Sequence, residues 1–167
     1  MRELILSLDP SSTIVGFAFM RFDGGLVKAG VIEPVKRAEP SYRRILSMRK
    51  DLRFILNEYR PDTILIEWTK GKVGRRHHGL GAGLAVYGCG VGAIATEAEH
   101  WAETNDSTVE AILENDWTRG VPKSTRRIAI ASLYREYRIG NDPGGDIADA
   151  IGMAVWWLRN RSQTICD

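Results

Sequence analysis

The stretch that decides the fold is LILSLDPSSTIVGFAF, residues 4–19, in which two apolar runs flank a short polar turn. Runs of this length, rich in aliphatic and aromatic residues, predict strands that are mostly buried. The first run ends in a carboxylate, Asp9, directly before the turn. A second turn, Asp23-Gly24-Gly25, leads to a third strand-like run over residues 26–32. The N-terminal part of the chain is therefore predicted to be an antiparallel meander.

Helical and strand-like patterns alternate over the rest of the chain. Helices are predicted over residues 41–60, 79–96, 122–137 and 146–161, and short strands over residues 63–67 and 109–113. This order predicts an α/β fold with a mixed sheet and helices packed on its faces. At 167 residues the chain fits one domain, residues 1–167, that is long enough to bury a core.

Composition narrows the class of protein. The hydrophobic share of 44% and the charged share of 26% are those of a globular domain, and the two cysteines form no disulfide framework. With no signal-peptide pattern at residues 1–10, we expect a cytoplasmic protein. Residues 79–96 (GLGAGLAVYGCGVGAIAT) are uncharged. Their Gly and Ala content favours a helix packed on a sheet or a second subunit over a membrane span.

Charge is distributed unevenly along the chain, although the net charge is only +2. Every charged residue from 97 to 116 is acidic, whereas three segments are mainly basic. One-sided basic segments are typical of proteins that contact a phosphate backbone. The residues expected to contact nucleic acid are Lys70, Lys72, Arg75, Arg76, His77, His78, Arg119, Lys123 and Arg126. The adjacent His77 and His78 point in different directions, which favours phosphate contact or a plain loop over a metal site.

Four acidic residues stand where they could converge. Asp9 and Glu67 each end an apolar strand, and Asp146 and Asp149 lie one turn apart at the start of the last helix. If these elements are neighbours, mutual repulsion of the carboxylates requires a cation, and ligands that are all oxygen favour Mg²⁺ or Mn²⁺. Separate structural roles are the alternative: a turn cap at Asp9, an exposed strand end at Glu67, and helix N-terminal acids at Asp146 and Asp149.

Four segments, in order, carry a resemblance to a known family. LSLDPSSTIVGFAF (residues 6–19) resembles the opening hairpin of RuvC-type Holliday-junction resolvases, and ILIE (residues 64–67) is similar to their second acidic strand. DIADAIGMA (residues 146–154) resembles their C-terminal helix, and PKS (residues 122–124) resembles their lysine-bearing segment. Together the segments cover nearly the whole chain.

The resemblance implies an RNase H-like fold with a mixed five-stranded sheet and a homodimer that nicks opposing strands of a four-way junction. It also implies Mg²⁺ bound by Asp9, Glu67, Asp146 and Asp149, with Mn²⁺ able to substitute. Two ions about 4 Å apart would activate the attacking water and stabilise the leaving 3′ oxygen. Lys123 would neutralise phosphate charge, and the helix at residues 79–96 is the expected dimer surface.

Two departures from the family pattern leave alternatives open. Ser11 stands where the family usually has Gly. The family tends to place an aromatic wedge shortly after the second acid, whereas Trp68 follows Glu67 directly and could stack on an opened junction or point into the core. The motifs also permit a nuclease for other branched DNA or for RNA, or a junction-binding protein that does not cut. An actin-like ATPase is disfavoured because the chain is short and has no second Gly-rich phosphate loop. The compact chain and the loose match to the family favour a phage or other mobile-element origin, and hence the cytoplasm of a bacterial or phage-infected cell.

Overall fold

The computed structural model describes residues 3–34, 39–68 and 81–164. Its strands are β1 (Leu4–Pro10), β2 (Val15–Arg21), β3 (Leu26–Ile32), β4 (Thr63–Trp68) and β5 (Thr108–Leu113). Its helices are α1 (Ser41–Tyr59), α2 (Gly81–Asn105), α3 (Glu114–Thr118), α4 (Lys123–Leu133) and α5 (Asp146–Thr164), with a 3₁₀ turn, η2, at Ile139–Asn141.

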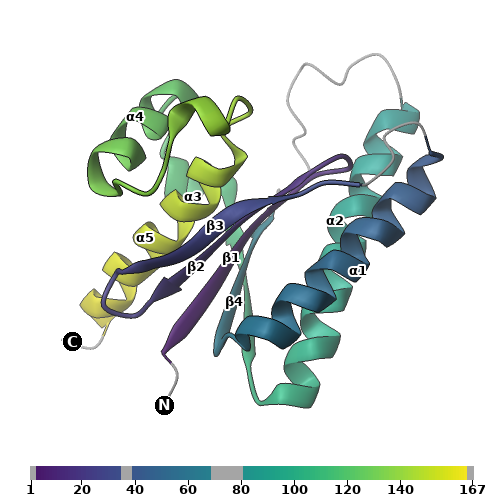
Figure 1. Cartoon of the computed structure of the whole chain (residues 1–167), viewed down its shortest axis with the longest axis horizontal. Coiled ribbons are helices and arrows are strands. Elements are labelled where there is room, and N and C mark those ends of the chain that lie inside the picture. The colour runs from purple at the N-terminus through teal and green to yellow at the C-terminus, as the bar shows by residue number, and fades with distance from the viewer. Residues whose placement is uncertain (1–2, 35–38, 69–80, 165–167) are drawn as a thin grey trace.

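The five strands form one mixed sheet in the order β3-β2-β1-β4-β5. The meander β1, β2 and β3 is antiparallel, whereas β4 is parallel to both β1 and β5. Helices cover both faces, with α1 and α2 on one and α5, α3 and α4 on the other (Figure 1). The predicted α/β class with a mixed five-stranded sheet and helices on both faces is therefore confirmed.

Side-chain alternation along the strands divides the core into two layers. Leu6 and Leu8 of β1 pack toward α1 and α2, together with Ile64 and Ile66 of β4. The residues that alternate with these along each strand face α5, and Ile5 and Leu65 are examples. Asp9 and Glu67 alternate in the same way as Ile5 and Leu65, so both lie on the face that α5 covers.

The helical predictions for the chain after β5 need correction. The helix predicted to run to about residue 137 ends at Leu133, because Tyr134 takes an extended conformation. The turn that follows brings Tyr137 into the core, where its hydroxyl donates a hydrogen bond to Asp142. The short helix α3 (Glu114–Thr118) was not predicted.

The helix predicted over residues 79–96 is longer in the structure, where α2 continues to Asn105. The uncharged segment forms the first part of α2 from Gly81 onward, and residues 79–80 lie outside the described residues. Gly90 of this helix packs closely on the turn between β1 and β2: an added Cβ would lie 2.9 Å from the Ser11 carbonyl oxygen. Within the described residues, no helix combines the length and apolar character needed to cross a bilayer.

Part of the charge pattern serves the fold itself. Glu97 of α2 is 1% exposed, and the guanidinium groups of Arg49 and Arg53 of α1 both bond its carboxylate. These two ion pairs hold α1 against α2. Without the arginines, the buried Glu97 carboxylate would have no compensating positive charge. Glu97 is therefore a structural residue and not part of a solvated acidic face, whereas Arg49 and Arg53 also remain partly exposed at the surface.

Candidate active site

Strand register places Asp9 beside Glu67. β1 and β4 are parallel neighbours, and Leu8 pairs with Ile66, so the next residue on each strand is an acid. Because the carboxyl ends of parallel strands meet at the same sheet edge, these two carboxylates are adjacent on the α5 face. Their proximity is also visible electrostatically, since Glu67 raises the pKa of Asp9.

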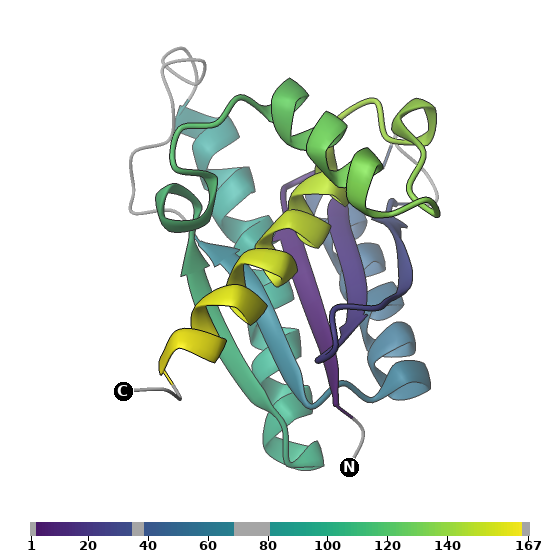
Figure 2. The same cartoon turned by 90° about the vertical axis from the view of Figure 1, so that its left-hand side faces the viewer.

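Gly16 allows the start of α5 to approach these strands. It pairs with Asp9 across the β1–β2 ladder. A Cβ at Gly16 would lie 2.2 Å from the carbonyl oxygen of Asp146 and 3.1 Å from its Cβ. Any side chain here would therefore push α5 off the sheet, and glycine lets Asp146 lie directly over the end of β1. Figure 2 shows α5 crossing this face of the sheet.

The buried residue Asp142 fixes the first turn of α5. Its carboxylate is 2% exposed and accepts hydrogen bonds from the backbone N–H groups of Ile147 (3.2 Å) and Ala148 (3.0 Å). These are N–H groups that a helix start leaves without a partner inside the helix. The Tyr137 hydroxyl holds the same carboxylate at 2.8 Å. Asp142 thus sets the position of Asp146 and Asp149.

Lys123 bridges the two acids of α5. Its Nζ lies 3.0 Å from Asp146 Oδ1 and 3.0 Å from Asp149 Oδ2, so both carboxylates point the same way, as their spacing predicted. Burial lowers the pKa of Lys123, but the carboxylates of Asp149, Asp9 and Asp146 outweigh that effect and raise it. Lys123 is therefore a permanent cation within the group of acids.

Asp149 is the most fully engaged of the four acids. The Arg126 guanidinium donates to both of its carboxylate oxygens, from Nε to Oδ1 at 2.8 Å and from Nη2 to Oδ2 at 3.0 Å. Lys123 makes a further contact with Oδ2. A carboxylate offers about four lone-pair positions, so these contacts leave Asp149 little capacity for another ligand. A cation bound there would share Asp149 with Arg126 or displace Lys123.

The pKa values show that the acids are crowded. Burial raises the pKa of Asp9 well above its ordinary value, and Glu67, Asp149 and Asp146 raise it further while Lys123 lowers it. Burial raises the pKa of Glu67 to about 7, with Glu114 and Asp149 adding to the shift, while a hydrogen bond from Trp117 and the charge of Lys123 oppose it. Raised values of this kind indicate carboxylates that lack sufficient compensating positive charge.

The donor set fits a hard divalent cation, since it is made of carboxylate oxygens whose repulsion a cation would relieve. The four acids come together from β1, β4 and α5. They do not form a finished cage: among residues 3–34, 39–68 and 81–164, no three His, Cys, Asp or Glu side chains meet closely enough to hold a metal as they stand. The Lys123 ammonium lies between two of them. Metal binding by this set stays a prediction.

Sequence reasoning missed three residues near the acids. Trp117 donates its indole N–H to Glu67 Oε2 at 2.8 Å. Tyr87 of α2 is half-buried, and its pKa is raised by burial and by the charges of Glu67, Asp9 and Glu114. Glu114, at the start of α3, is a further acid close to Glu67. None of the three belongs to the acidic or lysine-bearing motifs, so no motif pointed to them.

The predicted DNA-contact residues have mixed outcomes. Trp68 is 42% exposed at the end of β4, which excludes the core position and leaves stacking as the prediction. Arg119 is exposed, and with Trp117 and Arg126 it lines a groove of about 470 Å³ between α3, α4 and α5. Arg126 is turned toward Asp149, so its contact with DNA stays untested. The remaining residues, Lys70, Lys72, Arg75, Arg76, His77 and His78, lie outside the described residues.

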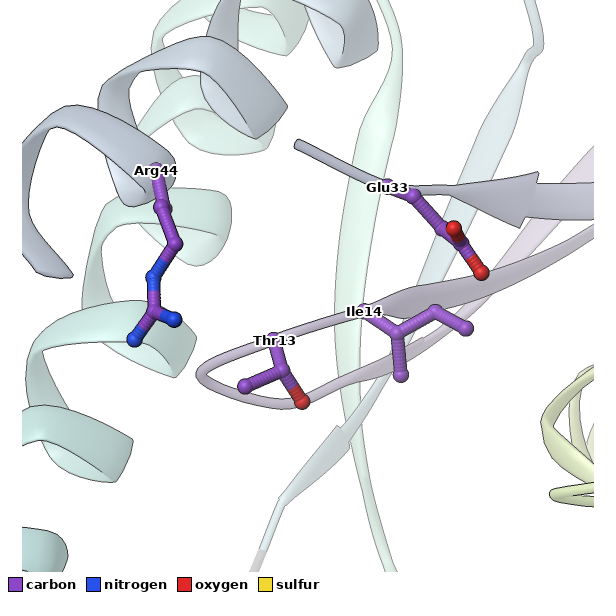
Figure 3. Close-up of a pocket in the computed structure, with 4 residues that line it drawn as sticks. All are labelled: Thr13, Ile14, Glu33 and Arg44. Carbon is purple, nitrogen blue, oxygen red and sulfur yellow. The ribbon is translucent and has the colours of Figure 1, made fainter. Parts of the chain in front are cut away.

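A separate cavity of about 290 Å³ lies on the other side of the β1–β2 turn. Thr13 and Ile14 of that turn, Glu33 after β3 and Arg44 of α1 line it, with Arg44 facing the other three across the space (Figure 3). None of the four acids borders this cavity. The candidate active site is therefore the carboxylate cluster and not this cavity.

No protein-family model and no curated protein matches the chain by sequence. Its structure is nevertheless similar over nearly its whole length to solved structures of RuvC from Thermus thermophilus. A RuvC structure in complex with a Holliday junction substrate matches with a TM-score of 0.69 and 15% sequence identity, covering 95% of this chain and 96% of that one. A second RuvC structure matches with a TM-score of 0.68 and 17% identity, covering 96% and 97%. The chain therefore has the RuvC-like form of the RNase H-like fold.

Proposed function

We propose that this protein is a Mg²⁺-dependent endonuclease that resolves four-way DNA junctions by paired nicks. The observation that carries the proposal is the gathering of Asp9, Glu67, Asp146 and Asp149 at one edge of a RuvC-like sheet. A similar fold has been solved with a Holliday junction bound, which supports junction DNA as the substrate.

In this proposal Asp9, Glu67 and Asp146 hold Mg²⁺, and Asp149 shares it. Bound Mg²⁺ supplies a Lewis acid that lowers the pKa of water and stabilises charge on the scissile phosphate. The Lys123 side chain is 39% exposed beside the acids. A DNA phosphate oxygen can therefore bind its ammonium group in place of Asp146 and Asp149. Binding of DNA would then release these carboxylates toward the metal.

The proposal is tested by cleavage of three labelled substrates of equal length: a four-way junction, a flap and a linear duplex, each with Mg²⁺ or with EDTA. We expect symmetric nicks in the junction with Mg²⁺, leaving 5′-phosphate ends, and none in EDTA. The linear duplex serves as the control for contaminating nuclease. Equal cutting of flap and junction would instead indicate a broader branched-DNA nuclease, and binding without cutting would indicate a junction-binding protein.

Paired nicking requires two active sites at a fixed separation, and we propose a homodimer formed through α2. The exposed part of this helix has Gly83, Gly88 and Gly92, at each of which an added Cβ would meet nothing within 4 Å in this chain. Leu84, between them, is 45% exposed. Small residues around an exposed leucine suit close approach of a second helix.

Leu84→Glu should convert the dimer to a monomer, because a charge would be buried in the proposed contact. Analytical ultracentrifugation measures the change, and junction cleavage should shift from paired to single nicks. Val27→Glu is the matched control, since Val27 is also 45% exposed but lies on edge strand β3, away from α2. A Leu84→Glu protein that stays dimeric would remove α2 from the interface.

A further inference from the structure

Trp117 connects β4 to α5 next to the candidate site. The residue is 8% exposed, and its indole N–H donates to Glu67 Oε2 at 2.8 Å. Its ring edge lies against Gly152 of α5, where an added Cβ would be 3.0 Å from the ring. The ring is thus fixed on one side by the helix that carries Asp149 and on the other by the Glu67 carboxylate.

Arg126 completes the connection. Its guanidinium carbon lies 4.9 Å from the centre of the Trp117 ring, within the range of a cation–π contact. The same guanidinium binds both oxygens of Asp149, and its Nη1 donates to the carbonyl oxygen of Val121. The Arg126 side chain is only 16% exposed, so its orientation is restrained from three directions.

We propose that Trp117 and Arg126 are a positioning pair that orients the carboxylates of Glu67 and Asp149 toward one shared cation. The inference rests on the proposed metal-dependent function. Neither residue need touch metal or DNA. The indole N–H occupies Oε2 of Glu67 and leaves Oε1 for a ligand, while the stacked guanidinium orients Asp149. Hydrogen-bond partners of this kind orient metal-binding carboxylates and change metal affinity by about 10- to 100-fold.

The pair also explains why α3 is present. Between β5 and α4, Glu114–Thr118 forms a helical turn that buries Trp117 against β4 and α5. Position 119 after it takes a left-handed backbone with φ of 47°. This turn returns the chain toward α4, which carries both Arg126 and Lys123. Trp117 of α3 and the two cations of α4 therefore surround the same acids.

Trp117→Phe tests the pair directly, because phenylalanine keeps an aromatic ring for Arg126 and removes only the N–H donor and part of the ring. Mn²⁺ binding to the protein alone, followed by electron paramagnetic resonance of free Mn²⁺, should weaken by about 10-fold or more. Junction binding in EDTA should be unchanged. Raising the Mg²⁺ concentration should restore much of the cleavage rate, since the ligands themselves remain.

Trp157→Phe is the matched control. Trp157 of α5 is 6% exposed, donates its N–H to Glu110 Oε2 at 2.7 Å and has Arg161 at 4.9 Å from its ring, away from the four acids. It should lose comparable stability without losing Mn²⁺ affinity. Arg126→Lys provides a second test at a residue near the surface: it keeps the charge but loses the two-pronged contact and should also weaken Mn²⁺ binding.

The outcomes separate the inference from the function on which it rests. Wild-type Mn²⁺ affinity in both Trp117→Phe and Arg126→Lys would overturn the positioning pair while leaving the nuclease proposal intact. Equal weakening in Trp157→Phe would also overturn it, because the effect would then follow general stability. A wild-type protein that binds no Mn²⁺ and cuts no junction would overturn both.

Discussion

Asp9→Asn should reduce Mg²⁺-dependent junction cleavage by about 10³-fold or more, the scale on which a single electrostatic group in an active site acts. Asp9 lies at the centre of the cluster, since the charges of Glu67, Asp146, Asp149 and Lys123 all act on it. Asparagine keeps the shape and removes the charge that would hold a cation. Single-turnover cleavage of a labelled junction measures the rate, and a gel-shift assay in EDTA should show unchanged binding.

The same variant should be more stable than the wild type when metal is absent. The pKa of Asp9 is raised in the folded protein, so the folded state binds its proton more tightly than the unfolded state does. This contribution to stability is present below the unfolded pKa near 3.8 and is lost as the pH rises through the folded value. At neutral pH in EDTA, Asp9 therefore lowers the free energy of unfolding of the wild type, and asparagine removes this effect. A melting temperature below that of the wild type would point to a folding role for Asp9 instead.

Gly16→Ala should destabilise the fold by about 3 kcal/mol, the upper part of the usual range for overpacking, and should also abolish cleavage. The added Cβ would lie 2.2 Å from the Asp146 carbonyl oxygen and 2.6 Å from its carbonyl carbon. These are backbone atoms that cannot rotate away, so α5 must lift from β2 and carry Asp146 with it. For a domain of this size the loss corresponds to a fall in melting temperature of roughly 10 °C.

Gly140→Ala is the control for Gly16→Ala, because an added Cβ at Gly140 meets nothing within 4 Å. Its melting temperature should stay close to that of the wild type, as for most surface substitutions. Differential scanning fluorimetry and the junction cleavage assay measure both variants. A Gly16→Ala protein with wild-type stability and cleavage would show that the close approach of α5 to β2 is not required.

Local sequence patterns were sufficient for most elements of the fold. Apolar runs ending at Asp9 and Glu67 predicted β1 and β4, and helical spacing predicted α1 and the start of α5 at Asp146. They were weaker where contacts between elements override local preference. The helix expected to reach residue 137 stops at Leu133, because burying Tyr137 against Asp142 requires the chain to turn.

The candidate site residues also divide into those that local sequence identified and those that only packing revealed. The four acids could be named from sequence because two end apolar strands, two begin the last helix, and all four lie in segments that resemble one family. Trp117 could not, since its partner Glu67 is 50 residues away and only the packing of α3 brings them together. Arg126 was assigned to DNA from its charge, yet its side chain lies against Asp149, 23 residues away.

By itself the sequence determined most of the elements and the acids at their ends or starts, because side-chain periodicity and turn residues act over a few neighbouring positions. Only the tertiary structure decided that Lys123 lies between Asp146 and Asp149, that Gly16 admits α5, and that Trp117 holds Glu67. These contacts depend on strand register and on how a helix crosses the sheet, and both arise from packing over the whole core.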